Sequence, residues 1–297
     1  MGWVVSALDS IVVKHNRAAG FAFIALVYVA ALVVGVVTYL VVASPSWPVR
    51  LLLADVAATV FVFVVSLVVG NASVYDPYWS VAPPVICAAL MPHRWDWGTV
   101  LLLAVVWLWG VRLTANWAVT FRNLGTQDWR YDDLKRQFPR AFPLVSLCGI
   151  MLFPTLVVYG CVIPAVFYLQ HPRLTWLTLV GLAVCLLGTG LELVADVQMQ
   201  RFRRANPAGG LIRQGLWTHA RHPNYLGEML MWWGVFVVAM SAVPNYWWTG
   251  VGALVNTAMF LFVSIPMADR RNRRRRDGFD EYCRQTNSLL PIPLVRR

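Results

Sequence analysis

The stretch "FAFIALVYVAALVVGVVTYLVVA", residues 21–43, is 23 residues long and carries no charged side chain. A helix needs roughly 20 consecutive apolar residues to cross the hydrocarbon core of a bilayer. The run is also too long for the apolar part of a cleaved signal peptide. We therefore interpret it as a membrane-spanning helix.

Similar runs follow along the rest of the chain. They cover 51–70, 97–121, 144–169, 174–198, 225–241 and 246–267, with a shorter run at 78–92. The composition agrees, because 59% of the residues are hydrophobic and only 13% are charged, against about 25% charged in a soluble domain. We predict an all-α protein, a polytopic transmembrane helical bundle of seven or eight membrane-crossing helices, forming a single integral membrane domain over 1–297.

The net charge of +11 does not indicate nucleic acid, because the basic residues follow the pattern of membrane loops. Most Lys and Arg residues lie before residue 21, in 122–143, in 201–222 and in the tail from 270. Positive charge collects on the cytoplasmic side of membrane proteins, so these regions and both termini are expected there. If the N-terminal lead and 122–143 are both cytoplasmic, the chain crosses the membrane an even number of times between them. The three long runs in this region therefore require a fourth crossing, by the short run 78–92, which would be an irregular helix because of Pro83 and Pro84. If 78–92 is instead re-entrant, the N-terminal lead lies on the other side of the membrane.

The five cysteines include no CxxC pair, and four of them lie within apolar runs. Buried cysteines in such runs behave as small hydrophobic residues. No disulfide or metal site is therefore expected.

Five ionisable side chains lie inside the apolar runs, where they are costly and usually face a cavity or one another. They are Asp55, Arg112, Glu192, Asp196 and Glu228. Asp55 is expected to reach the interface, and Arg112 either pairs with a carboxylate for packing or serves function. Glu192, Asp196 and Arg203 recur at helical spacing and so share one face. That face either fixes the bundle through ion pairs or forms the polar wall of a ligand cavity.

The stretch "RHPNYLGE", residues 221–228, combines a helix start with polar side chains. Pro223 is suited to the first position of a helix, whose free N–H groups lie beside Arg221 and His222 and make an anion site. Asn224 and Glu228 lie on one face of that helix, one turn apart. The pattern fits a ligand with an anionic end, such as a nucleotide cofactor; the plainer interpretation is a membrane anchor and helix start.

Three segments together resemble the steroid 5-alpha-reductase family, most closely its uncharacterised bacterial branch. They are "ELVADVQMQRF" (192–202), "GGLIRQGLWTHARHPNYLGE" (209–228) and "FDEYCRQTNSLLP" (279–291). Weaker similarity lies in "YDPYWSVAPP" (75–84) and "WGVRLTANW" (109–117). Residues 1–50 form an N-terminal lead and an added first helix, 51–143 are expected to be substrate-side helices, and 144–297 cofactor-binding helices.

The resemblance implies a membrane reductase, in a bacterial inner membrane, that holds NADPH in a cytoplasm-facing cavity. Hydride would pass to the β-carbon of an enone in a lipophilic substrate, whether a steroid, a polyprenyl chain or an unsaturated lipid. The family's cofactor-binding positions correspond to Asp196, Arg203, Arg213, Asn224, Tyr225 and Glu228, and by a looser alignment to Asn272 and Arg276. Glu192 replaces a family asparagine, and with Arg221 and His222 it completes the expected cofactor site.

The resemblance also places Asp76 where the reductases hold an acid beside the substrate carbonyl. The tyrosine that pairs with this acid in the family is Trp109 here, which has no phenolic proton. Nearby Tyr78, or Tyr75, is expected to supply the donor. Burial raises the pKa of a carboxyl, which would let Asp76 donate a hydrogen bond.

Two other functions compete with the reductase. Membrane methyltransferases that use S-adenosylmethionine share the "RHPxY…G…E" motif, but their cofactor has no phosphate to match Arg203 and Arg213. A scaffold that binds membrane lipids or sterols would use the 15 tryptophans and the basic tail. It would leave Asp196 and Glu228 buried without a purpose.

Overall fold

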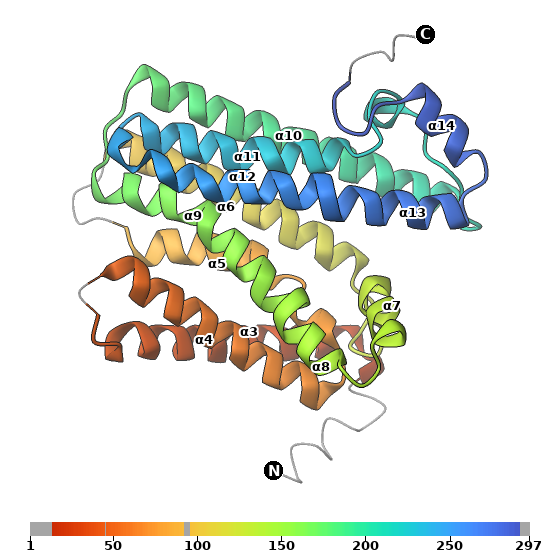
Figure 1. Cartoon of the computed structure of the whole chain (residues 1–297), viewed down its shortest axis with the longest axis horizontal. Coiled ribbons are helices and arrows are strands. Elements are labelled where there is room, and N and C mark those ends of the chain that lie inside the picture. Colours follow the sequence, from red (N-terminus) through yellow and green to blue (C-terminus); the bar gives the residue numbers. More distant parts are fainter. Residues whose placement is uncertain (1–13, 45, 92–95, 292–297) are drawn as a thin grey trace. The chain divides into compact units, whose positions relative to one another are not determined.

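The computed structural model describes residues 14–44, 46–91 and 96–291, and within these ranges the chain forms helices and no strand (Figure 1). Residues 1–13 of the predicted N-terminal lead lie outside the described part. The chain divides into two compact units. Unit 1 comprises residues 1–85 and 113–159, and unit 2 comprises 86–112 and 160–297.

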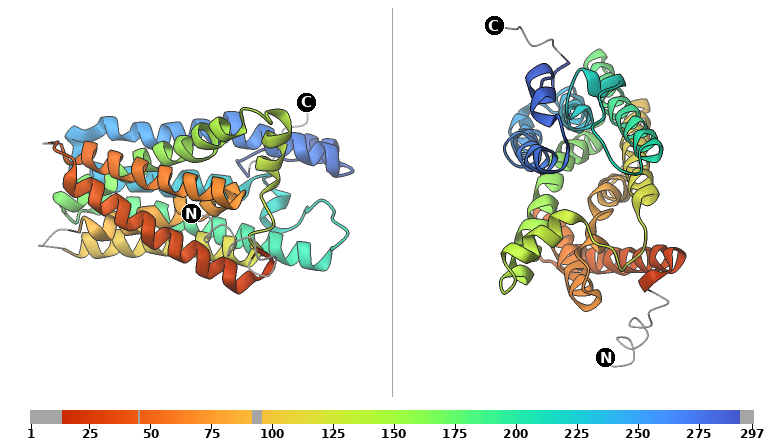
Figure 2. Two further views of the ribbon diagram at one scale, coloured as in Figure 1. Left: turned by 90° about the horizontal axis from the view of Figure 1, so that it is seen from below. Right: turned by 90° about the vertical axis from the view of Figure 1, so that its right-hand side faces the viewer.

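Unit 1 is built around a pair of long helices. Helices α3 (Arg17–Val41) and α4 (Trp47–Val69) lie side by side (Figure 2). The Asn16 side chain caps the start of α3, and Gly70, with a φ of 72°, ends α4 in a left-handed conformation that glycine adopts without strain. The smaller elements of the unit are η1 (Ala72–Tyr75), most of α5 (Tyr78–Ala89), the end of α6 (Trp97–Thr120), α7 (Trp129–Gln137), α8 (Phe142–Val145), the π-helical η2 (Ser146–Leu152) and the start of α9 (Phe153–Gln170).

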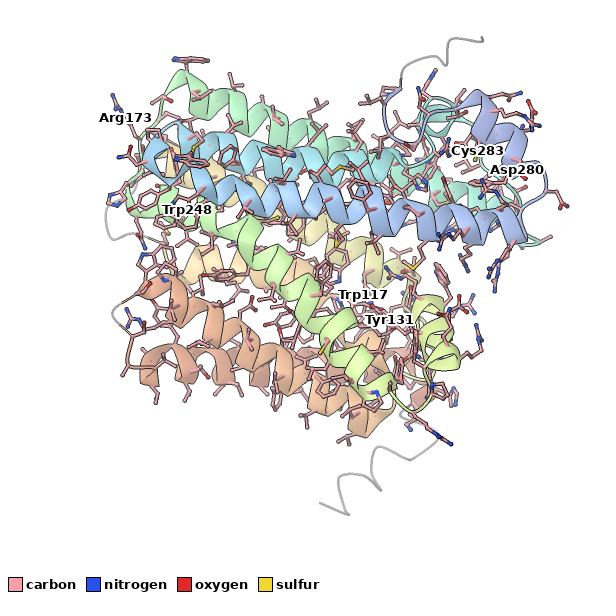
Figure 3. The ribbon with its side chains drawn as sticks, viewed as in Figure 1. Trp117, Tyr131, Arg173, Trp248, Asp280 and Cys283 are labelled. Carbon is pink, nitrogen blue, oxygen red and sulfur yellow. The ribbon has the colours of Figure 1, made fainter. Side chains whose placement is uncertain are left out.

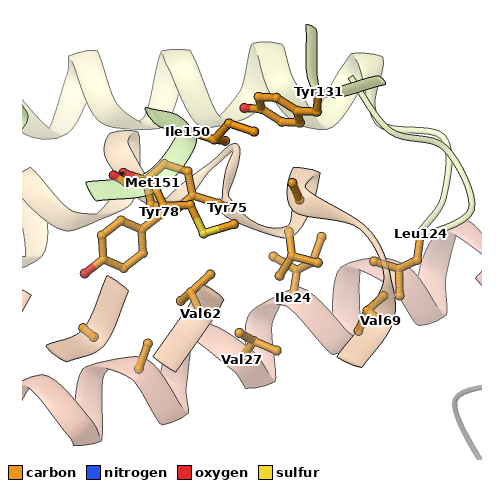
Figure 4. Packing of buried hydrophobic residues seen from close by; sticks show 14 residues of the cluster. Ile24, Val27, Val62, Val69, Tyr75, Tyr78, Leu124, Tyr131, Ile150 and Met151 are labelled. Atoms are coloured by element: carbon orange, nitrogen blue, oxygen red, sulfur yellow. Dashed lines mark hydrogen bonds between the residues drawn. The ribbon is translucent and has the colours of Figure 1, made fainter. Parts of the chain in front are cut away.

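The core of unit 1 joins this helix pair to the shorter elements. Ile24 of α3 and Val62 of α4 pack with Tyr75 of η1, Tyr131 of α7 and Met151 of η2 (Figure 4). Lipid tails are as apolar as these side chains, so within the spanning helices close van der Waals packing stabilises this core.

Unit 2 contains the first part of α6, the rest of α9 and the C-terminal helices. The latter are α10 (Trp176–Ala205), η3 (Gly215–Thr218), α11 (Pro223–Met240), η4 (Pro244–Gly250), α12 (Val251–Met259), η5 (Phe260–Ser264), α13 (Ile265–Arg275) and α14 (Phe279–Gln285). In this unit Arg173 and Trp248 lie at one end of the long helices, and Asp280 and Cys283 of α14 lie at the other (Figure 3).

Glycines let α10 and α11 approach closely. A Cβ on Gly188 would stand 2.5 Å from the carbonyl oxygen of Gly227, and one on Gly181 would stand 2.8 Å from that of Gly234. The two glycines of each helix are two turns apart, so they form one seam along the contact, as small residues do in membrane helix pairs. The seam continues to Glu192, whose Cγ would lie 2.5 Å from a Cβ on Gly227. It thereby brings the polar face of α10 against α11.

Within the described residues, six helices are long and apolar enough to cross a membrane. They are Arg17–Val41, Trp47–Val69, Trp97–Thr120, Phe142–Gln170, Trp176–Ala205 and Pro244–Arg275. The prediction of a polytopic helical bundle is confirmed, and the protein is an integral membrane protein.

The structure differs from the expected crossings at two places. Helix α11 has 18 residues and is not among the six, and its first turns contain Asn224 and Glu228. Helix α5 accommodates Pro83 and Pro84 yet has only 12 residues. It therefore spans about 18 Å, less than the ~30 Å hydrocarbon core.

Candidate functional site

A buried ionic cluster in unit 2 joins α6 to α10. Arg112 donates through Nη1 to Asp196 Oδ2 at 2.9 Å and through Nη2 to Glu192 Oε2. Arg112 is 8% exposed and Glu192 is 3% exposed. Arg112 therefore pairs with both carboxylates that the spacing of α10 placed on one face.

Glu228 of α11 completes this cluster. Its carboxylate accepts hydrogen bonds from the indole nitrogens of Trp109, at 2.9 Å, and Trp232, at 2.7 Å. The two indole rings meet edge to face with their centroids 4.9 Å apart. Glu228 also lies beside Glu192. Trp109 thus holds a buried carboxylate.

Two polar atoms of this cluster have no partner in the described residues. They are Nε of Arg112 and Oε1 of Glu192, and both are buried. A buried polar atom without a hydrogen bond costs free energy and calls for an explanation, such as a bound ligand or water. One of these atoms is a donor and the other an acceptor, which makes this cluster a candidate ligand site in unit 2.

Arg221 and His222, expected to form an anion site, contact a carboxylate that the sequence analysis did not single out. Asp269 of α13 lies 3.1 Å from Nη2 of Arg221 and 2.8 Å from Nε2 of His222. Arg221 also donates to the carbonyl of Thr286, and Tyr225 stacks on the His222 ring at 5.1 Å. Asp269 thus compensates the positive charge here, and a role of these residues in cofactor binding stays a prediction.

The other predicted cofactor residues lie near one end of the helices of unit 2. Arg203, near the end of α10, and Arg276, just after α13, are close enough to repel each other. The carboxylate of Asp196 also lies close enough to attract Arg203. Arg213 donates to the carbonyl of Gly278 at 2.6 Å.

Asn272 and Asn224, the two asparagines predicted to bind the cofactor, lie in α13 and α11. Asn272 lies in α13, where its backbone carbonyl accepts from the N–H of Arg276 at 2.8 Å. Asn224 is partly buried in the first turn of α11.

In unit 1, Asp76 accepts a hydrogen bond of 2.6 Å from the phenol of Tyr131. Burial raises the pKa of Asp76 to about 6, against the smaller lowering effects of the Tyr131 hydrogen bond and the Arg130 charge. Burial also raises the pKa of Tyr131 well above its ordinary value, so the phenol keeps its proton. The expected pKa shift of Asp76 is therefore present, but its partner is Tyr131, a residue that was not among the predicted site residues.

The tyrosines expected to pair with Asp76 have other partners. Tyr78 donates to Asp55 Oδ1 at 2.7 Å, and the Tyr75 hydroxyl lies 2.7 Å from the hydroxyl of Thr155. The two rings stack with centroids 5.3 Å apart. Asp55, which was expected to reach the interface, is instead 7% exposed.

Tyr131 reaches Asp76 because hydrogen bonds hold the loop before α7 against η1 and the residue before it. The Asn71 side chain donates to the carbonyls of Leu124, at 2.7 Å, and Thr126, at 3.0 Å. The backbone N–H of Asp128 donates to the Ser73 hydroxyl at 2.9 Å. These contacts come from residues about 55 positions apart, so no local pattern reveals them.

Comparison with known proteins agrees with the membrane fold. Steroid 5-alpha-reductase DET2 of Arabidopsis thaliana is 30% identical over 119 residues, which cover 39% of this chain and 42% of that protein. The similarity thus spans less than half the length of this relative. No solved structure matches the chain significantly. Residues 62–286, more than half of the chain, match the family described as "Protein of unknown function (DUF1295)", and the protein therefore belongs to that family.

Proposed function

We propose that the protein is a membrane-embedded, NADPH-dependent reductase that transfers a hydride to the activated C=C bond of a lipophilic, steroid-like enone. The similarity to a steroid 5-alpha-reductase supports this function. The observation that carries the proposal is the pair of unpartnered atoms, Arg112 Nε and Glu192 Oε1, in the buried cluster of unit 2.

These two atoms fit a primary carboxamide. The Nε–H of Arg112 can donate to an amide oxygen, and Oε1 of Glu192 can accept from an amide NH₂ group. NADPH carries this group on its nicotinamide ring, which supplies the hydride when the cofactor is bound. Arg112, Glu192 and Glu228 would therefore hold the ring end, and Asp196 would keep Arg112 in place.

The arginines near the end of α10 fit the phosphates of the same cofactor. Arg276 repels Arg203, which Asp196 attracts, and a phosphate group could accept charge-assisted hydrogen bonds from both guanidinium groups. Arg213, Asn224, Tyr225 and Asn272, with Arg221 and His222, stay proposed contacts to the rest of the dinucleotide.

The proton chemistry is assigned to Asp76 and Tyr131. The pair holds a phenolic proton next to a carboxyl that is partly protonated near pH 6. Such a pair can donate a hydrogen bond to a substrate carbonyl and stabilise the negative charge that develops on its oxygen. We therefore propose Tyr131, in place of Tyr78, as the phenolic donor beside Asp76.

The alternative cofactor is S-adenosylmethionine. Its sulfonium cation would be attracted by the carboxyl groups of the buried cluster. This observation supports a methyltransferase as the second candidate function. It has no phosphate, however, that Arg203 and Arg276 could bind. The exact substrate, the bacterial inner membrane and the cytoplasmic placement of both termini stay predictions.

Thermal unfolding of the purified protein with NADPH, NADH or S-adenosylmethionine tests the cofactor. A ligand at about 100 times its dissociation constant stabilises the fold by ~2.7 kcal/mol. We expect NADPH to raise the unfolding temperature most and NADH less. A shift with S-adenosylmethionine alone would replace the reductase by the methyltransferase.

A further inference from the structure

Asp55, a buried carboxyl of unit 1 that the proposed function does not use, begins a chain of hydroxyl groups. Its Oδ1 atom lies 2.7 Å from the hydroxyl of Tyr78. Tyr78 in turn forms a hydrogen bond with the side chain of Thr59, one turn after Asp55 on α4. All three side chains are buried.

The chain continues from Thr59 to the backbone of the π-helical turn η2. The Thr59 hydroxyl lies 2.9 Å from that of Thr155, and the Tyr75 hydroxyl lies 2.7 Å from the same Thr155 oxygen. Tyr75 also lies 3.0 Å from the carbonyl oxygen of Met151 (Figure 4). We call the four hydroxyl groups, those of Tyr78, Thr59, Thr155 and Tyr75, the hydroxyl chain.

Among the described residues, Asp55 has no oppositely charged partner. The guanidinium of Arg50, the preceding arginine on α4, lies over the ring of Tyr39, and Tyr28 of α3 donates to the carbonyl of Val74. The titratable groups that face Asp55 from other elements are phenols, those of Tyr75, Tyr78 and Tyr159. A buried carboxylate without a cation is costly, and binding a proton removes that cost.

A count of hydrogens links Asp55 to the far end of the chain. Five hydrogen bonds join Asp55, the hydroxyl chain and the Met151 carbonyl, but the four hydroxyls supply only one hydrogen each. A protonated Asp55 supplies the fifth, because it donates to Tyr78 and each hydroxyl then donates to the next. An ionised Asp55 can only accept, so every hydroxyl turns towards it and the bond from Tyr75 to Met151 is lost.

We propose that Asp55 is a proton-binding site and that its proton sets the direction of the hydroxyl chain. The proposal is independent of any cofactor or substrate. Proton uptake adds a hydrogen bond between η1 and η2 and removes a buried charge from α4. Because π-helical turns are rare and often lie at functional sites, this bond gives a proton on Asp55 control over a distinctive part of unit 1.

Infrared spectroscopy of the purified full chain detects this proton, because a protonated carboxyl has a C=O band that a carboxylate lacks. An exposed aspartate is already ionised at about pH 5. At this pH we expect a carboxyl band in the wild type that Asp55→Asn lacks, and we expect the band to disappear as the pH rises. Should Asp55→Asn not fold, ¹³C labelling of the aspartate carboxyls identifies the band in the wild type.

Thr59→Val tests the coupling by interrupting the hydroxyl chain. Both protonation states of Asp55 then have the same number of hydrogen bonds, so protonation loses its advantage of one bond. The pH midpoint of the band should fall by about half to one unit, which corresponds to one hydrogen bond. Thr155→Val should lower the midpoint similarly although Thr155 is two hydroxyls away from Asp55, and it serves if Thr59→Val does not fold.

Ser66→Ala is the matched control. Ser66 is also buried on α4, but its hydroxyl donates to the carbonyl of Phe63 in the same helix. Its midpoint should equal that of the wild type. The absence of an Asp55 carboxyl band at about pH 5 would overturn the proposal, and so would a midpoint that neither threonine variant changes. Either result would leave the proposed reductase untouched.

Discussion

Gly227 lies against Gly188 so closely that a Cβ on either residue would stand 2.5 Å from the carbonyl oxygen of the other. This approach lets the backbones of α10 and α11 touch. It also places Glu192, one turn beyond Gly188, beside Glu228, one residue after Gly227. The carboxylates of the candidate cofactor site are thus positioned by two residues that have no side chain.

Gly188→Ala should therefore destabilise the protein by about 1–3 kcal/mol, because the added methyl group meets backbone atoms that cannot move aside. Gly190→Ala is the matched control on the same helix, since no atom lies within 4 Å of the added Cβ. It should be neutral or slightly stabilising, because alanine favours helix more than glycine does. Thermal unfolding in detergent measures both, and equal effects would contradict the close contact.

Trp109→Phe should lower the free energy of unfolding by roughly 1.5–3 kcal/mol. It removes one of the two donors to the buried Glu228 carboxylate, and hydrogen bonds to charged groups contribute about that much. Trp107→Phe is the control, because Trp107 lies on the same helix and is 44% exposed. Should the two variants unfold alike, the Trp109 hydrogen bond would have no role in stability.

Tyr131→Phe should lower kcat by about 100-fold or more, in the range typical of general acid groups, with little change in cofactor affinity. Tyr78→Phe should instead reduce stability, since Tyr78 donates to the buried Asp55. Steady-state kinetics and thermal unfolding of the two variants separate these roles. A full kcat in Tyr131→Phe together with a lost kcat in Tyr78→Phe would restore Tyr78 as the donor.

Asp76 should make both activity and stability depend on pH. Its pKa is about 6 in the folded protein and 3.8 ordinarily, so folding favours the protonated carboxyl. The resulting stabilisation, at most about 3 kcal/mol, is present at low pH and is lost as the pH rises from about 4 to about 6.

Activity should likewise fall as the pH rises through about 6, because the donating form of Asp76 is lost. Asp76→Asn cannot titrate, so it should remove this part of the pH dependence and most of the turnover. Full turnover in Asp76→Asn would exclude Asp76 from the mechanism.

Arg203→Ala should weaken NADPH binding by about 10-fold or more, as expected for a lost hydrogen bond between charged groups. NADH, which lacks the 2′-phosphate, should be affected far less. Arg201→Ala is a useful control, because Arg201 is also exposed near the end of α10. Equal losses for NADPH and NADH would assign Arg203 to the pyrophosphate or to structure.

Much of the fold could be predicted from the sequence, because a helix that crosses lipid needs roughly 20 consecutive apolar residues. The apolar run 97–121 corresponds to α6 (Trp97–Thr120), and the run 144–169 corresponds to the candidate span Phe142–Gln170. Helix α10 continues beyond the apolar run 174–198 to Ala205. Its last turns are charged, and the helical spacing of Glu192, Asp196 and Arg203, not apolarity, predicts this continuation.

Part of the candidate site also follows from sequence. Helical spacing predicts that Glu192 and Asp196 share one face, and one of the two interpretations of Arg112 pairs it with a carboxylate. The contacts of Trp109 with Glu228 and of Tyr131 with Asp76 could not be predicted, because they join residues 119 and 55 positions apart. The paired glycines of α10 and α11 recur at a spacing of two turns, and that signal was available in the sequence.

The central proposal is that a hydride passes from NADPH to the β-carbon of a lipophilic enone. The most direct measurement uses purified protein, NADPH with deuterium at both C4 positions of the nicotinamide ring, and a panel of steroid and polyprenyl enones. We expect the wild type to form a saturated product with one deuterium at the β-carbon. Asp76→Asn should form little or none of this product. A protein that binds NADPH but transfers no deuterium to any of these enones would contradict the proposal.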